Sequence, residues 1–195
     1  SRAMSRQDID FRSASVTDAA AIARVQVDTW RDAYVGILPD QCLIDMSDIG
    51  AAARWTTAIA ENNDPEMFVV AVWNGEVVGF CQGAISEFDV SGPPGAKVDG
   101  AGVIHTLYVD PSFQAQGIGT AMMFCVADRL REVGCRSLML LVLSENRTGR
   151  GFYDKLGGVA GEEIPCVVLG NPTHETPYHW PNIATLLDEL EAAIS

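Results

Sequence analysis

The chain contains little cysteine, and what it has is not arranged in pairs. Its 195 residues include five cysteines, an odd number, and no two of them form a C-x-x-C motif. This argues against a disulfide framework and against a cysteine-based zinc site. Reduced, buried thiols are the simpler interpretation, and they predict a cytoplasmic protein.

Positive charge and long hydrophobic runs are also scarce. Thirteen Lys and Arg stand against 26 Asp and Glu, and the net charge of −13 disfavours nucleic acid or an anionic membrane as a partner. The longest aliphatic run, residues 138–143, is far shorter than a membrane span. Residues 1–8 are polar and lack the apolar region of a signal peptide, so we expect them to be disordered or to derive from an expression vector.

Several familiar catalytic and phosphate-binding motifs are missing. No Gly-Lys pair exists for a P-loop, and Met122 occupies the place of the third small residue of a Rossmann fingerprint. No G-x-S-x-G elbow occurs, and His174-Glu175 lacks the second His of a zincin motif. The sequence therefore predicts no metal site.

Strand-like and helical segments alternate along the chain. The predicted strands are residues 9–14, 67–73, 76–88, 103–109, 137–143, 159–169 and 175–180. The predicted helices are residues 17–34, 47–60, 117–133, 146–156 and the segment from 182 onward. Asn74-Gly75 predicts a hairpin, and residues 91–102, rich in Gly and Pro, predict a flexible loop. This order favours a mixed α/β fold with a central sheet flanked by helices on both faces.

The segment 107–120 is the most informative one. A strand runs into a loop with Gly117 and Gly119, and the loop leads directly into a helix. The glycines allow consecutive backbone N–H groups to point at one place, at the positive end of the helix dipole. No charged side chain occurs between Asp110 and Asp128. The segment is therefore either a phosphate or pyrophosphate site or an ordinary Gly-containing turn.

These residues resemble the acetyl-CoA signature of the GNAT superfamily of N-acetyltransferases. The signature, Gln/Arg-x-x-Gly-x-Gly/Ala, is matched by Gln114, Gly117 and Gly119, after a Leu107-x-Val109 strand. A second family motif follows at the expected distance, with Asn146 and then the run of residues 152–157. The resemblance covers roughly residues 9–181 and implies a mostly antiparallel, splayed sheet.

The resemblance implies a role for each residue of the two motifs. The residues that would bind the pyrophosphate, chiefly through their backbone amides, are Gln114, Ala115, Gln116, Gly117, Ile118, Gly119 and Thr120. The main chain of Leu107 and Val109 would pair with pantetheine, and Asn146 would hydrogen-bond the pantetheine arm. Tyr153 would be the general acid that protonates the leaving thiolate. The alternative for Tyr153 is a half-buried packing side chain with a hydrated hydroxyl group. Gly149 and Gly151 predict that the helix carrying Tyr153 is frayed or irregular without ligand.

The general base and the acceptor site are less strongly indicated. His105 stands two residues before Leu107, and a pKa near ~6.5 suits a base at neutral pH. The alternatives are a strand histidine satisfied by backbone or solvent, and a water chain that carries the proton away. Trp30 and Tyr34 are four apart on one helix face in a region that borders the acceptor site in the family, and core packing is their alternative.

Together these features predict an acetyl-CoA-dependent N-acetyltransferase that acts on a primary amine of a small molecule or peptide. The alternatives are a non-catalytic CoA-binding sensory domain and an enzyme that uses a longer acyl-CoA. We expect one domain over residues 9–181, followed by a C-terminal helix over 182–195. Homodimers are frequent in the family, which makes one possible here.

Overall fold

The computed structural model describes residues 8–88 and 97–194 and divides the chain into two compact units. The first unit comprises Ser1–Gln82 and Thr106–Val126, and the second comprises Gly83–His105 and Ala127–Ala193. Three elements pass from one unit into the other, namely β3 (Glu76–Phe88), β4 (Lys97–Val109) and α4 (Ile118–Glu132). Residues 1–7 of the N-terminal segment expected to be disordered or vector-derived, and residues 91–96 of the predicted loop, lie outside the described residues.

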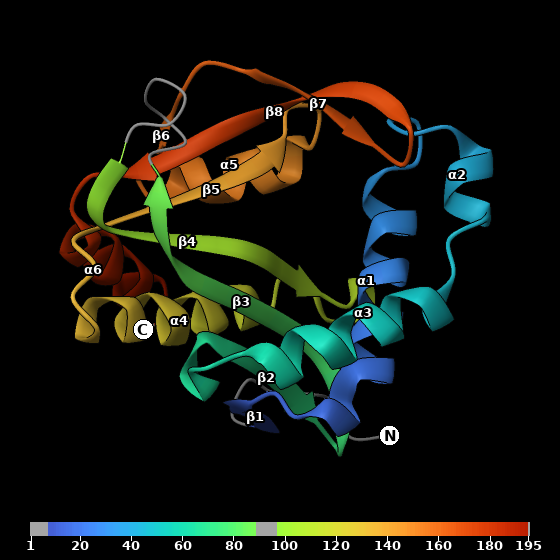
Figure 1. Ribbon diagram of the computed structural model, residues 1–195, viewed down its shortest axis with the longest axis horizontal. Coiled ribbons are helices and arrows are strands. Elements are labelled where there is room, and N and C mark those ends of the chain that lie inside the picture. The colour runs from blue at the N-terminus through green and yellow to red at the C-terminus, as the bar shows by residue number, and fades with distance from the viewer. Residues whose placement is uncertain (1–7, 89–96, 195) are drawn as a thin grey trace. The chain divides into compact units, whose positions relative to one another are not determined.

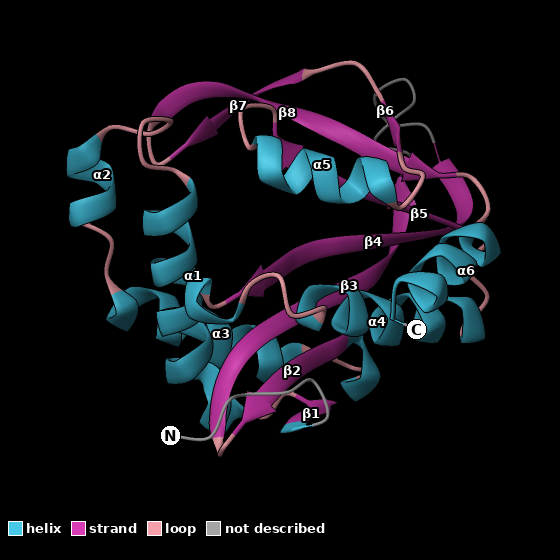
Figure 2. Ribbon diagram, turned by 180° about the vertical axis from the view of Figure 1, so that it is seen from behind, coloured by secondary structure: helices cyan, strands magenta, loops and turns pink. Residues whose placement is uncertain are grey.

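The first unit contains the N-terminal helices and strands. Its complete elements are β1 (Ile9–Ser13), η2 (Val16–Asp18), α1 (Ala19–Ala33), α2 (Asp40–Ile44), α3 (Asp48–Glu61), η3 (Pro65–Met67), β2 (Phe68–Trp73) and η4 (Pro111–Phe113). Strand β2 pairs antiparallel with β1 on one side and with β3 on the other, with an irregular register between Ala71 and Val72. Helices α1 and α3 lie side by side in Figure 1 and in the reverse view of Figure 2.

A hydrophobic core joins these helices to the strands. Its buried members come from α1, β2 and β3, and they are Ile22, Val25, Phe68, Val70, Val77 and Phe80. Trp55 and Ile59 of α3 pack against this cluster, and the Trp55 ring meets the rings of Phe68 and Phe80 edge-on at 5.6 and 5.2 Å. The helical spacing of Trp55 and Ile59 therefore places both on the face that α3 turns to the core.

The second unit is built around β5 and β8. Its complete elements are β5 (Ser137–Leu143), α5 (Arg147–Lys155), β6 (Val159–Ala160), β7 (Ile164–Val168) and β8 (Asn171–Trp180), and α6 (Ile183–Ile194) follows them. Strand β5 pairs parallel with β4 over four residue pairs that end at Ile104 and Leu140, and antiparallel with β8 over residues 138–143. Both β6 and β7 pair antiparallel with β8. Helix α5 lies along β5 and β8 in Figure 2.

The predicted fold class is confirmed. The strands form one open, mainly antiparallel sheet in the order β1-β2-β3-β4-β5-β8-β6, with β7 paired to β8, and helices accompany it. Asn74 and Gly75 have φ values of 51° and 78°, as a tight hairpin turn requires. No described helix is long and apolar enough to cross a membrane.

Several predicted elements differ from those of the structure. Strand β4 begins at Lys97 rather than at 103, because Gly102 belongs to the strand: a Cβ there would lie 2.9 Å from Leu130 Cδ1, so glycine permits close approach of α4. The strand predicted over 159–169 is divided into β6 and β7, and β8 begins at Asn171 rather than at 175. Helix α2 was not predicted, because Gly36 and Pro39 indicated only the end of the preceding helix.

Candidate functional site

The loop between β4 and α4 belongs to the first unit and has a well-defined start. The backbone N–H of Asp110 donates to Val78 O at 2.8 Å, which holds the end of β4 against β3. The Asp110 carboxylate accepts a hydrogen bond from Ser112 N at 2.9 Å and caps the short turn η4. Helix α4 then begins at Ile118, so the structure has the strand, loop and helix that the sequence predicted.

Backbone N–H groups at the start of α4 have no acceptor in the part of the chain that the structure describes. Ala115 and Gly117 have φ values of 62° and 78°, which turn the chain sharply before the helix. Among the described residues, none accepts a hydrogen bond from the backbone N–H of Ala115 through Thr120. The first turn of α4 carries no acidic residue. These N–H groups lie at the positive end of a 15-residue helix, which is a suitable environment for an anion.

The side chains of the loop have more limited roles. Ile118 and Thr120 are buried, so their side chains are not available to a ligand. Gln114 is exposed, and its Nε2 donates to Val109 O at 3.2 Å, which ties the loop to the end of β4. Gln116 is exposed. Gly119 has an ordinary negative φ, and a Cβ there would lie 3.6 Å from Val109 Cγ2, a normal contact. The fold alone therefore does not require glycine at 119.

The end of β4 directs main-chain groups away from β3. Because the N–H of Asp110 bonds to β3, strand geometry points the N–H and C=O groups of Val109, and of Leu107 two residues earlier, to the opposite edge. The Val109 carbonyl already accepts from Thr29 Oγ1 at 3.3 Å and from Gln114. A ligand pairing with this edge would therefore use the Val109 N–H and the groups of Leu107.

His105 lies on the part of β4 that belongs to the second unit. Its side chain is exposed, but the surrounding protein desolvates the ring enough to lower the pKa of His105 below the ordinary value of 6.5. The imidazole is therefore neutral at pH 7 and able to accept a proton.

Asn146 begins helix α5 in the second unit. Its Oδ1 accepts a hydrogen bond from Gly149 N at 3.0 Å, which makes Asn146 the N-cap of the helix. A Cβ at Gly149 would lie 2.8 Å from Asn146 Nδ2, so glycine makes room for the cap. The helix is continuous from Arg147 to Lys155. The prediction that its two glycines would make it frayed or irregular without ligand was therefore wrong. The cap occupies only Oδ1, and Nδ2 has no acceptor among the described residues.

Tyr153 is half-buried against aromatic side chains of β8. Its ring centroid lies 5.6 Å from that of Tyr178 and 6.1 Å from that of Trp180. Tyr178 OH donates to Asp154 Oδ1 at 2.8 Å, and Trp180 Nε1 donates to Leu156 O at 2.9 Å. Neither Tyr178 nor Trp180 was predicted from the sequence as part of the site. An aromatic pair at alternate positions of a strand was the available signal, because alternate residues share one face.

Trp30 and Tyr34 contact one another on α1, in the first unit. Their rings meet edge-on with centroids 5.0 Å apart. Tyr34 is buried, as core packing would require, and Trp30 is half-buried. The indole N–H of Trp30 is buried and has no hydrogen-bond partner among the residues that the structure describes, whereas those of Trp55 and Trp180 are both bonded.

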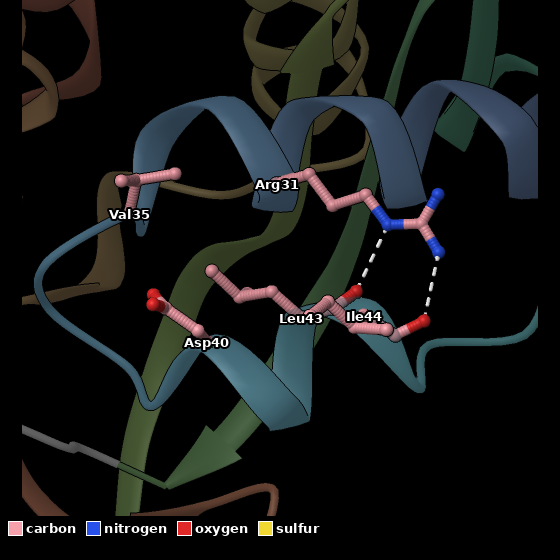
Figure 3. A pocket seen from close by; sticks show the side chains of 5 residues that line it. All are labelled: Arg31, Val35, Asp40, Leu43 and Ile44. Carbon is pink, nitrogen blue, oxygen red and sulfur yellow. Dashed lines mark hydrogen bonds between the residues drawn. The ribbon is translucent and has the colours of Figure 1, made fainter.

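A pocket of about 520 Å³ lies between α1 and α2. Arg31 and Val35 of α1 and three residues of α2, Asp40, Leu43 and Ile44, line it (Figure 3). The Arg31 guanidinium donates to Leu43 O at 2.9 Å and to Ile44 O at 3.4 Å, which holds α2 in place. The pocket was missed because α2 was missed. Asp40 directly after Pro39 was the available signal for a helix start.

Metal binding receives no support from the described parts of the chain, residues 8–88 and 97–194. Within them, no group of three or more His, Cys, Asp or Glu side chains is placed to hold a metal ion.

Comparison with known proteins agrees with this architecture. Residues 27–158 match the acetyltransferase (GNAT) family, and this span includes the loop before α4, Asn146 and Tyr153. An acetyltransferase of Pectobacterium atrosepticum is 33% identical over 109 residues, which is 56% of this chain and 67% of the relative. The aminoglycoside N(6')-acetyltransferase type 1 of Stenotrophomonas maltophilia is 29% identical over 128 residues, 66% of this chain and 71% of that protein.

A solved structure shows the same fold. The PaiA N-acetyltransferase of Thermoplasma acidophilum, in complex with coenzyme A, aligns with a TM-score of 0.67 at 17% identity, covering 86% of this chain and 97% of that one. The resemblance found in the sequence is confirmed by the family match over more than half of the chain. The chain belongs to the acetyltransferase (GNAT) family and is an N-acetyltransferase.

Proposed function

We propose that the protein transfers the acetyl group of acetyl-CoA to a primary amine of a small molecule or peptide. One observation supports this proposal above the others: the N–H groups of Ala115 through Thr120 have no acceptor in the described protein and lie at the start of α4. The pyrophosphate of acetyl-CoA would supply the missing acceptors, and the helix dipole would favour its charge.

The rest of the coenzyme would be held by main-chain and amide groups. Leu107 and Val109 would pair with the pantetheine arm through the strand edge that faces away from β3. The unused Nδ2 of Asn146 would donate to a pantetheine carbonyl, while its Oδ1 continues to cap α5. This arrangement uses neutral donors, which suits a protein whose net charge of −13 offers few cations.

The proposed reaction is direct attack of the amine on the thioester. The amine nitrogen forms a bond to the acetyl carbonyl carbon, and a tetrahedral oxyanion results, which a main-chain N–H of β4 would stabilise. The C–S bond then breaks and coenzyme A leaves as a thiolate. Tyr153 would give its proton to that thiolate, since a phenol near pKa ~10 and a thiol near ~8.5 are close enough for transfer.

The attacking amine must first lose a proton, because a lysine-like amine with a pKa near ~10.4 is mostly charged at pH 7. His105 is neutral there and would accept that proton, directly or through water. The nitrogen of the tetrahedral intermediate must lose a second proton as the amide forms, and this proton would return the ionised Tyr153 to its phenol form, directly or through water. The proton on His105 would then pass to solvent, which restores the enzyme after each turnover.

For the acceptor we propose the region around Trp30, Tyr34 and the pocket between α1 and α2. The exposed Asp40 carboxylate on that pocket would attract a cationic amine. The relative from Stenotrophomonas maltophilia is named for aminoglycosides, which are polycationic amines, and this makes them a reasonable class to test.

Purified protein mixed with acetyl-CoA and a panel of amines, with free thiol measured, tests the proposal. The panel should contain aminoglycosides, alkyl diamines and peptides with a free N-terminus, and each should also be tried with a longer acyl-CoA. Thiol release with acetyl-CoA and at least one amine is expected. Faster release with the longer donor would contradict the acetyl donor. Coenzyme binding without release from any amine would favour the CoA-binding sensory domain.

Two further expectations stay predictions. All five cysteines are free thiols, which is compatible with a cytoplasmic location. A homodimer would be recognised by light scattering during size-exclusion chromatography.

A further inference from the structure

Two hydrogen bonds connect β8 to the end of α5, just after Tyr153. Tyr178 OH donates to the Asp154 carboxylate at 2.8 Å, one residue after Tyr153. Trp180 Nε1 donates to the backbone carbonyl of Leu156 at 2.9 Å, at the end of the same helix. The last turn of α5 is therefore fixed to the strand at two points.

The rings that make these bonds also hold the Tyr153 ring. Tyr178 is fully buried and Trp180 is 2% exposed, so neither ring is free to move. The Tyr153 ring packs against both, with interplanar angles of 47° to Tyr178 and 79° to Trp180. Contact with these two rings leaves the half-buried phenol of Tyr153 little freedom to rotate about its χ angles.

The chain just after α5 is packed onto the same pair of rings. A Cβ at Gly158 would lie 2.7 Å from Trp180 Cζ2 and 2.9 Å from Tyr178 Cδ1. The segment that follows the helix therefore cannot shift without displacing the two rings.

A cation completes the hydrogen-bond network around Tyr178. Arg150 Nε lies 3.4 Å from Tyr178 OH, and its NH1 donates to Ser144 O at 3.3 Å, before the start of α5. Burial raises the pKa of the Tyr178 phenol, so it keeps its proton and continues to donate to Asp154 at neutral and mildly alkaline pH.

We infer that Tyr178 and Trp180 are positioning residues for Tyr153: they fix the backbone of α5 and the orientation of the phenol ring, and they take no part in proton transfer themselves. This inference rests on the proposed role of Tyr153 as the general acid. A proton donor must lie within about 2.6–3.2 Å of the atom it protonates, so a small displacement of α5 slows the step sharply.

Single-turnover rates of acetyl transfer, with enzyme in excess over acetyl-CoA, test the inference without interference from product release. The variants are Tyr178→Phe, which keeps the ring and removes the hydroxyl group, Trp180→Phe, Tyr153→Phe and the double variant Tyr153→Phe/Tyr178→Phe. The acceptor is an amine that the panel identifies. Trp55→Phe is the control, since it also removes an indole hydrogen bond, the partly buried one to Gln26, but beside the core of the first unit.

Tyr178→Phe is expected to slow single-turnover acetyl transfer about three- to tenfold and to leave the Kd for acetyl-CoA unchanged. In the Tyr153→Phe background the same change should have no further effect, because there is no longer an acid to position. Trp180→Phe should act like Tyr178→Phe. Trp55→Phe should lower the melting temperature and leave the rate unchanged.

Equal slowing by Tyr178→Phe with and without Tyr153 would overturn the inference, since it would indicate a general loss of structure. An unchanged rate in Tyr178→Phe would overturn it too, while slowing by Tyr153→Phe would still support the acid. If Tyr153→Phe itself leaves the rate unchanged, both the acid role and the inference fail, although transfer by the wild type stands. Wild-type protein that releases no thiol with any amine would defeat the proposed function as well.

Discussion

The residues of the β4–α4 loop differ in whether their backbone conformation requires glycine. Gly117 has a φ of 78°, which glycine adopts without strain, and Ala115 adopts a similar value of 62° at a cost of roughly 1–2 kcal/mol. Gly119 has no such requirement, and its Cβ would meet only Val109. Ala115 is strained, and the fold does not require glycine at 119. This combination indicates that an interaction outside the fold, such as a bound ligand, determines the residues of this loop.

Gly119→Ala should weaken coenzyme A binding at least about tenfold, because a methyl group would come between the amides and the pyrophosphate. Its stability should be equal or higher, by up to about 1 kcal/mol, since alanine is the better helix former. Isothermal calorimetry and thermal melting measure the two effects. In contrast, Gly117→Ala should lower the melting temperature. Unchanged affinity in Gly119→Ala would leave the loop an ordinary turn.

His105 predicts a distinct pH dependence. Because burial lowers its pKa below 6.5, kcat/KM should rise as pH increases through that lower value and be limited above it only by the ionisation of the amine. His105→Gln should remove the acidic limb and reduce kcat/KM by at least about tenfold. The profile from pH 5 to 9 measures both. An acidic limb that persists in His105→Gln would assign the base to another group or to water.

At the scale of elements, two hairpins make the same turn with different residues. Asn74-Gly75 joins β2 to β3, and Leu169-Gly170 joins β7 to β8, with closely matching φ values. Asparagine tolerates a left-handed φ far better than leucine does. Leu169 is 48% exposed, so it gains little from burial in return.

Leu169→Asn should therefore stabilise the protein by about 0.5–1 kcal/mol, a rise in melting temperature of roughly 1–4 °C for a chain of this size. Val167→Asn, at an exposed strand position of the same hairpin, should instead lower the melting temperature, because asparagine is a poor strand residue. A lower melting temperature for Leu169→Asn would refute the strain at this turn.

The junction between β1 and α1 depends on a partly buried ion pair. Asp18 accepts from Arg12 NH1 at 2.8 Å, from Arg12 NH2 at 2.9 Å and from Ser15 N at 2.8 Å. The hydrogen bond from Arg12 is the main cause that lowers the pKa of Asp18 below its ordinary value of 3.8. The charged form is therefore the one that stabilises the fold.

Asp18→Asn should cost about 1–2 kcal/mol at pH 7. Because the folded pKa is depressed, the deficit relative to wild type should be complete above pH ~4 and shrink as pH falls through the lower folded value. Thermal melts at several pH values measure it, with Asp10→Asn at an exposed site of β1 as the control. A deficit independent of pH would show that the charge of Asp18 is unimportant.

At the scale of the whole molecule, hydrophobic periodicity predicted most elements, because the spacing of apolar residues within one helix or strand shows which face is buried. Helices α1, α3 and α4 repeat apolar residues at helical spacing, and in β5 the apolar run 138–143 is buried except at Leu141. The extent of β4 could not be predicted, since Gly102 suggests a loop until Leu130 is known to pack on it. Tertiary contact decided that position.

The residues of the candidate site also fall into two groups, those that local sequence patterns reveal and those that only tertiary contacts reveal. The loop and Asn146 could be found because a turn, a helix start and an N-cap leave their marks at fixed short spacings. Tyr178 and Trp180 could not be paired with Tyr153 by spacing, because 24 residues separate each from its hydrogen-bond partner on α5. The pocket lining between α1 and α2 likewise depended on a five-residue helix too short for periodicity to reveal.

The central claim is that main-chain amides of the β4–α4 loop bind a pyrophosphate. Calorimetric titration of the wild-type protein with coenzyme A, and separately with pantetheine, which has no phosphate, tests it most directly. Coenzyme A should bind at least about a hundredfold more tightly, because only it supplies acceptors for those amides. Equal affinity for the two compounds, or no affinity for coenzyme A, would contradict the claim.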